Sequence, residues 1–182
     1  GLADAAPELL HEVRAADVVL RDPEQPRGDG EVGRAIAEVG QHIDPAGDPK
    51  FARIPDKYQG GSRVWGHKDA VAAFVRMAED AASNGYVLKA VSAFRSFSDQ
   101  KEIWENKWTG KTLVGGKKLN VSTPDPKARA AKILEFSSMP ATSRHHWGTD
   151  FDINNLNNSY FNTRDGKRIY DWLTQHAPQY GF

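Results

Sequence analysis

One segment near the middle of the chain limits the fold more than any other. From His67 onward, apolar residues recur every three or four positions and form one broad face: Val71, Phe74, Val75, Met77, Ala78, Ala81 and Ala82. This spacing predicts an α-helix, and Asn84-Gly85 supplies the left-handed stop at which helices commonly end. The segment from Tyr86 to Ser92 follows directly. It is rich in β-branched and aromatic residues, so it predicts a strand.

The rest of the chain alternates between helical patterns and breaks. Further helices are predicted over residues 4–20, 30–42, 98–108, 125–136 and 166–176. The alternating "TDFDI" at 149–153 predicts a second strand, and the prolines and glycines of 44–61 predict a loop. Residues 109–125 predict a long polar loop or a hairpin around Gly115-Gly116. Long helices with a few short, separated strands indicate an α+β fold rather than a regular βαβ series.

Composition excludes several classes of protein and of site. The 182 residues suit one domain, with room for an N-terminal appendage. The 24 basic and 24 acidic residues balance without a long block of one sign, so no nucleic-acid partner is indicated. No apolar run is long enough for a membrane span, and the first residues lack the pattern of a signal peptide. Because cysteine is absent, any metal has to be bound by His, Asp or Glu.

The eleven residues "SRHHWGTDFDI" at 143–153 concentrate such ligands. His145 and Asp152 lie seven positions apart with Gly148 between them. A loop that turns at the glycine into a strand brings imidazole and carboxylate to one point, a donor set that suits Zn²⁺ where thiolates are lacking. The alternative is a histidine held in a buried hydrogen-bond network, beside a strand whose aspartates cap neighbouring turns.

A second polar stretch, "VSAFRSFSDQ", places Arg95 at the carboxyl end of the predicted strand. Ser92, Ser96 and Gln100 surround it in the sequence. An arginine in this position can offer a bidentate guanidinium to a carboxylate or to a developing oxyanion. The alternative is a surface arginine that forms an ordinary ion pair.

Together these stretches resemble a known family. "SAFRSFSDQ" is similar to the motif S-G-Y-R-S-x-x-x-Q, and "SRHHWGTDFD" to S-x-H-x-x-G-x-x-x-D, of the D-alanyl-D-alanine carboxypeptidases of the vancomycin-resistance type. These zinc peptidases act on peptidoglycan stem peptides and are related to D,D-dipeptidases, L,D-carboxypeptidases and phage endolysins. The resemblance covers residues 51–182 and implies a zinc D-Ala-D-Ala peptidase-like fold, with a small, central, mostly antiparallel sheet flanked by helices. Residues 1–50 are expected to form a helical extension packed on this domain.

The resemblance also implies roles for individual residues. His145 and Asp152 become zinc ligands, and Arg95 becomes the catalytic group that binds the substrate and steadies the tetrahedral intermediate. Ser143 and Gln100 become hydrogen-bonding partners of the substrate. A metal-activated water attacking a peptide carbonyl needs such a fixed positive partner for the oxyanion.

The chain departs from the family pattern in two places. The family completes its site with a motif E-x-W-H, which supplies the general base and the third metal ligand. We expect this motif beyond Phe182. Asp150 stands where many relatives carry a small apolar residue, and it shares a strand face with Asp152. It is expected near the substrate or beside a ligand histidine, with a turn or salt-bridge role as the alternative. We expect His146 to form part of the wall of the peptide cleft rather than to bind the metal.

The leading hypothesis is a zinc-dependent carboxypeptidase that removes a terminal D-amino acid, D-alanine, from peptidoglycan stem peptides. One alternative is a catalytically inactive peptidoglycan-binding or regulatory module on the same fold, because the base and the third ligand are missing from the 182 residues. Another is a cell-wall endopeptidase of the endolysin type. A substrate in the wall implies a periplasmic or cell-surface location, and we expect a monomer.

Overall fold

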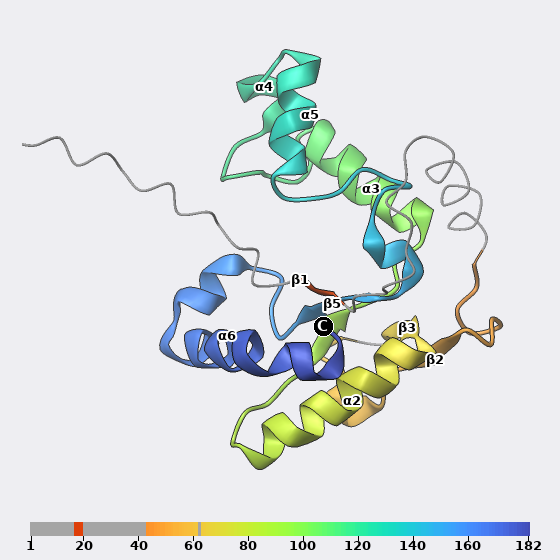
Figure 1. Ribbon diagram of the computed structural model, residues 1–182. Helices are drawn as coiled ribbons and strands as arrows, with labels where there is room; N and C mark the ends of the chain where they lie inside the picture. The colour runs from red at the N-terminus through yellow and green to blue at the C-terminus, as the bar shows by residue number, and fades with distance from the viewer. Residues whose placement is uncertain (1–16, 20–42, 62) are drawn as a thin grey trace, which may run out of the picture.

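A small antiparallel sheet lies at the centre of the molecule (Figure 1). The computed structural model describes residues 17–19, 43–61 and 63–182. The sheet has the order β1-β5-β4, and its strands are β1 (Asp17–Val19), β5 (Asp150–Ile153) and β4 (Ala90–Ser92). Both pairings are antiparallel, so β5 is paired on both edges. A second antiparallel pair joins β2 (Phe51–Arg53) to β3 (Trp65–His67).

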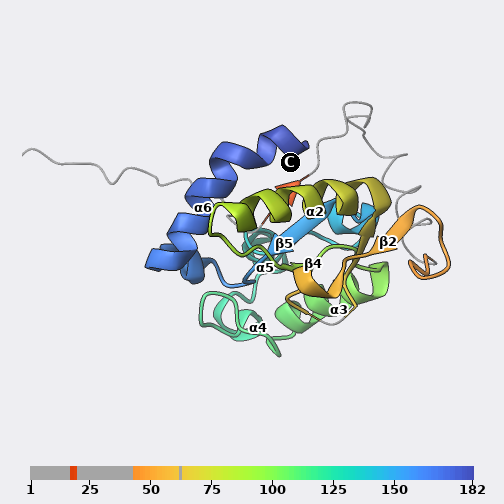
Figure 2. The same ribbon diagram turned by 90° about the horizontal axis from the view of Figure 1, so that it is seen from below.

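Helices lie on both sides of this sheet. They are α2 (Lys68–Ser83), α3 (Phe97–Trp108), α4 (Leu119–Ser122), α5 (Pro126–Leu134) and α6 (Arg164–His176). Single turns of 3₁₀ helix occur at η1 (Asp56–Tyr58), η2 (Arg144–Trp147), η3 (Asn158–Asn162) and η4 (Ala177–Tyr180). Helices α2 and α6 lie on one side of the sheet and α3, α4 and α5 on the other (Figure 1), and α2 passes in front of β5 when the molecule is seen from below (Figure 2). The predicted α+β class is therefore confirmed.

Two apolar clusters hold these elements together. In the larger one, Phe74 of α2 contacts Phe151 of β5 at 5.3 Å between ring centroids, and α6 adds Trp172 and Leu173. Most of the predicted apolar face of α2 belongs to this cluster, whereas Ala82, which was predicted on the same face, is exposed. The smaller cluster comprises Val114, Leu119 and Ile133, with the half-buried Trp104 and Trp108 against it. Burying such side chains stabilises a fold by about 1.5–3 kcal/mol each, so the larger cluster dominates.

Helix ends follow local hydrogen bonds. Helix α2 begins where predicted, because the His67 side chain accepts a hydrogen bond from the Asp69 amide, and Gly85 has the expected positive φ of 79°. Helix α3 begins at Phe97, one residue before the predicted range, because Ser96 caps it. Ser96 and Asp99 form a reciprocal capping box. Helix α5 is capped by Asp125 as its Asp-Pro start predicts.

The predicted strand 86–92 is much shorter in the structure, because a side chain replaces part of the ladder. Asn154 takes a left-handed φ of 62° just after β5. Its amide group accepts from the Lys89 amide (2.7 Å) and donates to the Val87 carbonyl (2.8 Å). Residues 86–89 are thereby held by one asparagine, and only Ala90–Ser92 pairs as a strand.

Other predictions changed as well. Residues 44–61 are not all loop, since they contain β2 and η1. The predicted helix 4–20 is wrong at residues 17–19, which form β1, and its remainder and the helix 30–42 lie outside the described residues. The glycine pair forms the expected turn through a bridge between Val114 and Lys117, and α4 follows it. The division into an extension (1–50) and a domain (51–182) stays a prediction. Within the described residues, no helix combines the length and apolarity needed to cross a bilayer.

Candidate active site

The two faces of the short strand β5 carry different side chains, apolar on one face and acidic on the other. Successive side chains of a strand point to opposite faces, so Phe151 and Ile153 enter the core and are fully buried. Asp150 and Asp152 point to the other face, where they are 4% and 5% exposed. Two nearly buried carboxylates side by side are costly unless cations or hydrogen-bond donors accompany them. The neighbouring segments supply such groups.

The turn before β5 positions His145. Ser143 caps η2 by accepting a hydrogen bond from the His145 amide (3.3 Å), and Gly148 ends this turn with a φ of 68°. The Gly148 carbonyl accepts from the His67 amide at 2.8 Å. A Cβ atom at Gly148 would lie 2.6 Å from that same nitrogen. Only glycine permits both the left-handed conformation and this close approach, so the motif's glycine anchors the site to the start of α2.

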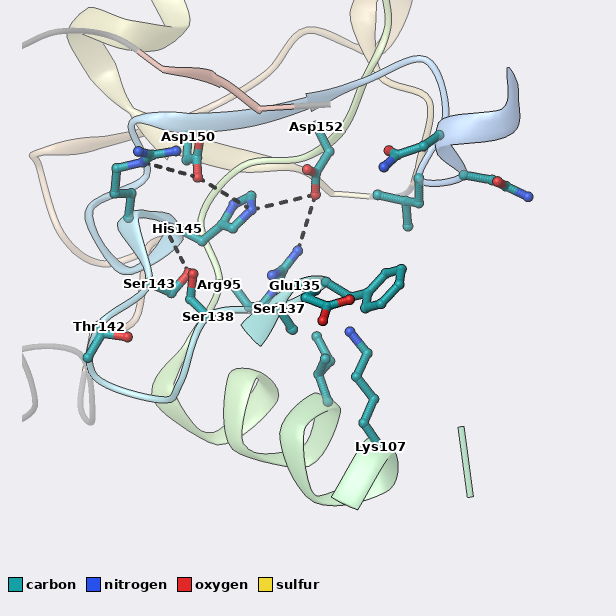
Figure 3. A pocket seen from close by; sticks show the side chains of 16 residues that line it. Arg95, Lys107, Glu135, Ser137, Ser138, Thr142, Ser143, His145, Asp150 and Asp152 are labelled. Carbon is teal, nitrogen blue, oxygen red and sulfur yellow. Dashed lines mark hydrogen bonds and ion pairs between the residues drawn. The ribbon is translucent and has the colours of Figure 1, made fainter. Parts of the chain in front are cut away.

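The imidazole of His145 has a defined orientation. Its Nδ1 atom lies 2.7 Å from the Ala93 carbonyl oxygen. Because a carbonyl can only accept, Nδ1 donates this hydrogen bond, and Nε2 is the ring nitrogen that faces the aspartates. Nε2 lies 3.6 Å from Oδ2 of Asp152 and 3.8 Å from Oδ2 of Asp150 (Figure 3). The predicted ligand pair, His145 and Asp152, is thus brought together.

Arg95 meets this group from the end of β4. Its Nη2 atom lies 3.2 Å from Oδ2 of Asp152 and also donates to the hydroxyl of Ser92 (3.2 Å). Its Nη1 atom donates to Oε1 of Gln100 at 2.9 Å. The Arg95 amide donates to the His145 carbonyl at 3.0 Å. Backbone and side chain together fix the guanidinium beside the Asp152 carboxylate.

Gln100 lies behind Arg95 and not in the cavity. The side chain is fully buried and donates to the Ser138 carbonyl (2.6 Å) and to the Ser137 hydroxyl (3.3 Å). Its predicted contact with substrate stays a prediction. The structure places this residue so that it orients Arg95 and joins α3 to the segment after α5. Ser143, by contrast, lines the cavity beside His145.

The side chain of His146 is buried in the protein interior and does not line the cavity. It is 2% exposed, and its Nε2 accepts from the Ala141 amide at 3.1 Å. Its Nδ1 therefore donates to the Arg95 carbonyl at 2.8 Å. Burial lowers the pKa of His146 below its usual value, which keeps the ring neutral. Both ring nitrogens are occupied, so His146 supports the loop that carries its neighbour.

Sequence reasoning missed Arg144, which belongs to the same group. Its Nε atom lies 3.6 Å from Oδ2 of Asp150, and half of its side chain is exposed. The two residues are six positions apart and meet only because the chain turns at Gly148. The sequence signal was present in the motif itself, as an arginine next to the ligand histidine, but its partner depends on the turn.

Arg95, His145, Asp150 and Asp152 form the floor of a cavity of about 660 Å³. In the close-up view, His145 lies between Asp150 and Asp152, with Arg95 beneath Asp152 (Figure 3). Lys107 and Glu135 stand on the opposite wall (Figure 3). The remaining lining residues are Ile103, Phe136, Ser137, Ser138, Thr142, Ser143, Arg144, Leu156, Asn157 and Asn158. A polar floor with a partly apolar far wall suits an extended polar ligand such as a peptide.

The donors present fit a zinc ion in part. Two ligands at about 2.0–2.2 Å from a tetrahedral zinc lie roughly 3.3–3.6 Å apart, which agrees with the 3.6 Å between His145 Nε2 and Asp152 Oδ2. The hydrogen bond from Nδ1 to a backbone carbonyl is the support that metal-binding histidines usually have. Among the described residues, no three His, Asp or Glu side chains form a metal-binding group. They therefore offer two donors of a zinc site.

Comparison with known proteins finds relatives that are named as carboxypeptidases. YodJ of Bacillus subtilis (strain 168), which is named as a carboxypeptidase, is 31% identical over 121 residues, covering 63% of this chain and 37% of YodJ. The solved structure of the LD-carboxypeptidase LdcB is 28% identical with a TM-score of 0.50, covering 74% of this chain and 57% of that one. This chain therefore spans less than two thirds of either relative.

A further solved structure shows the same fold with a metal. A variant of the vancomycin-resistance D,D-pentapeptidase VanY in complex with Zn(II) is 22% identical with a TM-score of 0.50, covering 71% of this chain and 68% of that one. The family model VanY, described as D-alanyl-D-alanine carboxypeptidase, matches residues 64–182, which contain every site residue described above. The chain therefore belongs to the VanY family of D-alanyl-D-alanine carboxypeptidases.

Proposed function

We propose that this protein is a zinc-dependent carboxypeptidase that removes a terminal D-alanine from peptidoglycan stem peptides. One observation carries the proposal: Nε2 of His145 lies 3.6 Å from Oδ2 of Asp152, and the guanidinium of Arg95 lies 3.2 Å from the same carboxylate. Membership of the VanY family and the Zn(II) bound by a VanY of similar fold support it.

Each of the site residues would have a separate role in the reaction. His145 and Asp152 would hold zinc, which supplies a Lewis acid able to lower the pKa of water toward neutrality. Arg95 would place a fixed positive charge where the substrate carbonyl develops negative charge. Because its guanidinium is already oriented by Gln100 and Ser92, little reorganisation is needed as that charge appears. Ser143 would offer its hydroxyl to the peptide from the edge of the cavity.

The cavity suits the extended end of a peptide more than a compact small molecule. Its volume of about 660 Å³ falls within the range of ligand pockets, and its floor is lined by ionic side chains. A stem-peptide substrate implies that the protein acts outside the cytoplasm, in the periplasm or at the cell surface. We expect it to act as a monomer.

The test is a cleavage assay with metal analysis on the full-length protein. A synthetic stem pentapeptide ending in D-Ala-D-Ala is incubated with zinc-loaded protein, and released D-alanine is measured by chromatography. Tetrapeptide and cross-linked muropeptides distinguish D,D-carboxypeptidase, L,D-carboxypeptidase and endopeptidase activity. If the protein is metal-free and none of these substrates is cleaved, the proposal is wrong and a binding module on the same fold replaces it.

A further inference from the structure

Two arginine–aspartate pairs flank His145. On one side Asp152 pairs with Arg95 at 3.2 Å, and on the other Asp150 pairs with Arg144 at 3.6 Å. The two aspartates lie 3.6 and 3.8 Å from the same atom, Nε2 of His145. Both pairs therefore face one point on the cavity floor, and each places a guanidinium beside it.

The side chains of the two arginines differ in how much of their surface is exposed. The Arg95 side chain is 18% exposed and is held by Asp152, Gln100 and Ser92. The Arg144 side chain is 51% exposed and lines the cavity. The side chain of Asp150, which it contacts, is only 6% exposed. Arg95 is thus part of the floor, whereas Arg144 contacts Asp150 through Nε and keeps half of its side chain exposed where it lines the cavity.

The charge of the floor indicates which ligand group it receives. Two guanidinium groups balance the carboxylates of Asp150 and Asp152, and His145 is neutral when it offers Nε2 to a metal. Binding of a zinc ion at His145 and Asp152 would add positive charge to a nearly buried site. An anionic group of the ligand is then favoured close to this point. In a peptide that ends at the site, that group is the terminal α-carboxylate.

We propose that Arg144, positioned by Asp150, binds the free α-carboxylate of the peptide and thereby restricts the site to chain ends. The inference rests on the proposed function, since it names the group that distinguishes a carboxypeptidase substrate from an internal peptide bond. A guanidinium matches a carboxylate through two parallel hydrogen bonds, which a lysine cannot reproduce. Asp150 is a positioning residue in this scheme and does not contact the substrate.

The opposite wall offers one competing cation. Lys107 also lines the cavity, but it stands beside Glu135, away from His145 (Figure 3). A carboxylate bound there would place the peptide in the reverse direction, with its terminal residue on the far wall. The two orientations make opposite predictions for substitutions at Arg144 and Lys107.

The experiment compares one peptide in two forms, with a free C-terminal carboxylate and with a C-terminal amide. For the full-length, zinc-loaded protein, kcat/KM is measured for both forms. Dissociation constants for acetyl-D-alanine and its amide are measured by NMR titration. The acid-to-amide ratio is expected to fall about tenfold or more in Arg144→Gln, since a charge-assisted hydrogen bond is lost. Arg144→Lys should recover part of this ratio, and Asp150→Asn should lower it while zinc content is retained.

Two variants serve as controls. Lys107→Gln removes the competing cation and should keep the acid-to-amide ratio. Arg164→Gln removes an exposed arginine of α6 that does not line the cavity. An unchanged ratio in Arg144→Gln, or a larger fall in Lys107→Gln, overturns the inference even if the peptide is cleaved. If no peptide is cleaved the proposed function fails, but the NMR titration still tests the inference. Equal binding of acid and amide by the unaltered protein contradicts it.

Discussion

Oε1 of Gln100 accepts a hydrogen bond of 2.9 Å from Nη1 of Arg95, and the Gln100 side chain has no exposed surface. The other end of its amide donates to the Ser138 carbonyl at 2.6 Å. This second bond fixes which end of the amide faces Arg95. The orientation of a guanidinium in the cavity therefore depends on a residue that the cavity does not reach.

Replacement of Gln100 by leucine should lower kcat and leave KM nearly unchanged. The leucine fills similar space but leaves Arg95 without one of its hydrogen bonds, at a cost of about 1–1.5 kcal/mol, or roughly tenfold in rate. Steady-state kinetics with the stem peptide measures both constants, and Glu102→Gln on the exposed face of α3 is the control. A raised KM with unchanged kcat would instead indicate direct contact between Gln100 and substrate.

Zinc binding and catalysis should separate among the site residues. We expect His145→Ala and Asp152→Ala to lose bound zinc together with activity, whereas Arg95→Ala retains zinc and loses activity. The separation follows because Arg95 is a cation and contributes no lone pair to a metal. Elemental analysis of purified full-length protein gives the zinc content, and circular dichroism confirms folding. His176→Ala, whose ring stacks on Trp172 at 4.6 Å, is the control that should retain both. Zinc loss in Arg95→Ala would contradict this division.

Gly148→Ala should destabilise the protein much more than Gly115→Ala. Both glycines have a positive φ, 68° and 56°, so each alanine pays a similar backbone cost of about 1 kcal/mol. At Gly115 the new methyl group meets nothing within 4 Å, but at Gly148 it lies 2.6 Å from the His67 amide nitrogen. The additional cost of this clash should bring the total to about 2–4 kcal/mol. Urea denaturation measures both, and equal losses would show that the turn adapts.

Tyr180 ties the end of the chain to α2 in a way that depends on pH. Its hydroxyl donates to Oδ2 of Asp80 at 2.8 Å, and this hydrogen bond raises the pKa of Tyr180. A raised pKa means that the stabilisation is complete below the usual tyrosine pKa of about 10, and that it disappears as pH rises through the higher folded-state value.

Tyr180→Phe should therefore lower the free energy of unfolding by about 1 kcal/mol at pH 7. The difference from the unaltered protein should narrow once the pH exceeds about 10. Denaturation curves across this pH range provide the measurement. Tyr170→Phe is the control, because the Tyr170 hydroxyl makes no hydrogen bond in the described part of the chain. A difference that does not vary with pH would rule out the hydroxyl as its source.

The sequence predicted the main residues of the candidate site because they are close together in the chain. Strand alternation placed Asp150 and Asp152 on one face, and the glycine between His145 and the strand allowed the turn. Two relationships could not be predicted. The pairing of Arg144 with Asp150 depends on how η2 folds back over β5, and the burial of Gln100 depends on residues 137 and 138, nearly forty positions later.

The fold, like the site, was predicted best where the interacting residues are close together in the chain. The helices α2, α5 and α6 have a strong period in their own sequences and were predicted to within two residues at their starts. Three-residue strands such as β2 contain too few positions for alternation to be recognised. The early end of the strand at Ala90 results from Asn154, a residue more than sixty positions away whose side chain substitutes for backbone pairing. Such contacts are visible only when the chain is folded.

The two apolar clusters support different walls of the cavity, and we expect these walls to differ in local stability. The floor rests on the larger cluster through Phe151, whereas the wall that carries Lys107 and Glu135 rests on the smaller one around Ile133. A segment held by few buried side chains opens more often than one in the main core. Amide protons of α5 should therefore exchange with deuterated solvent well before those of β5. If the proposed function holds, a peptidoglycan strand would enter past the less stable wall, while the residues of the floor keep their positions.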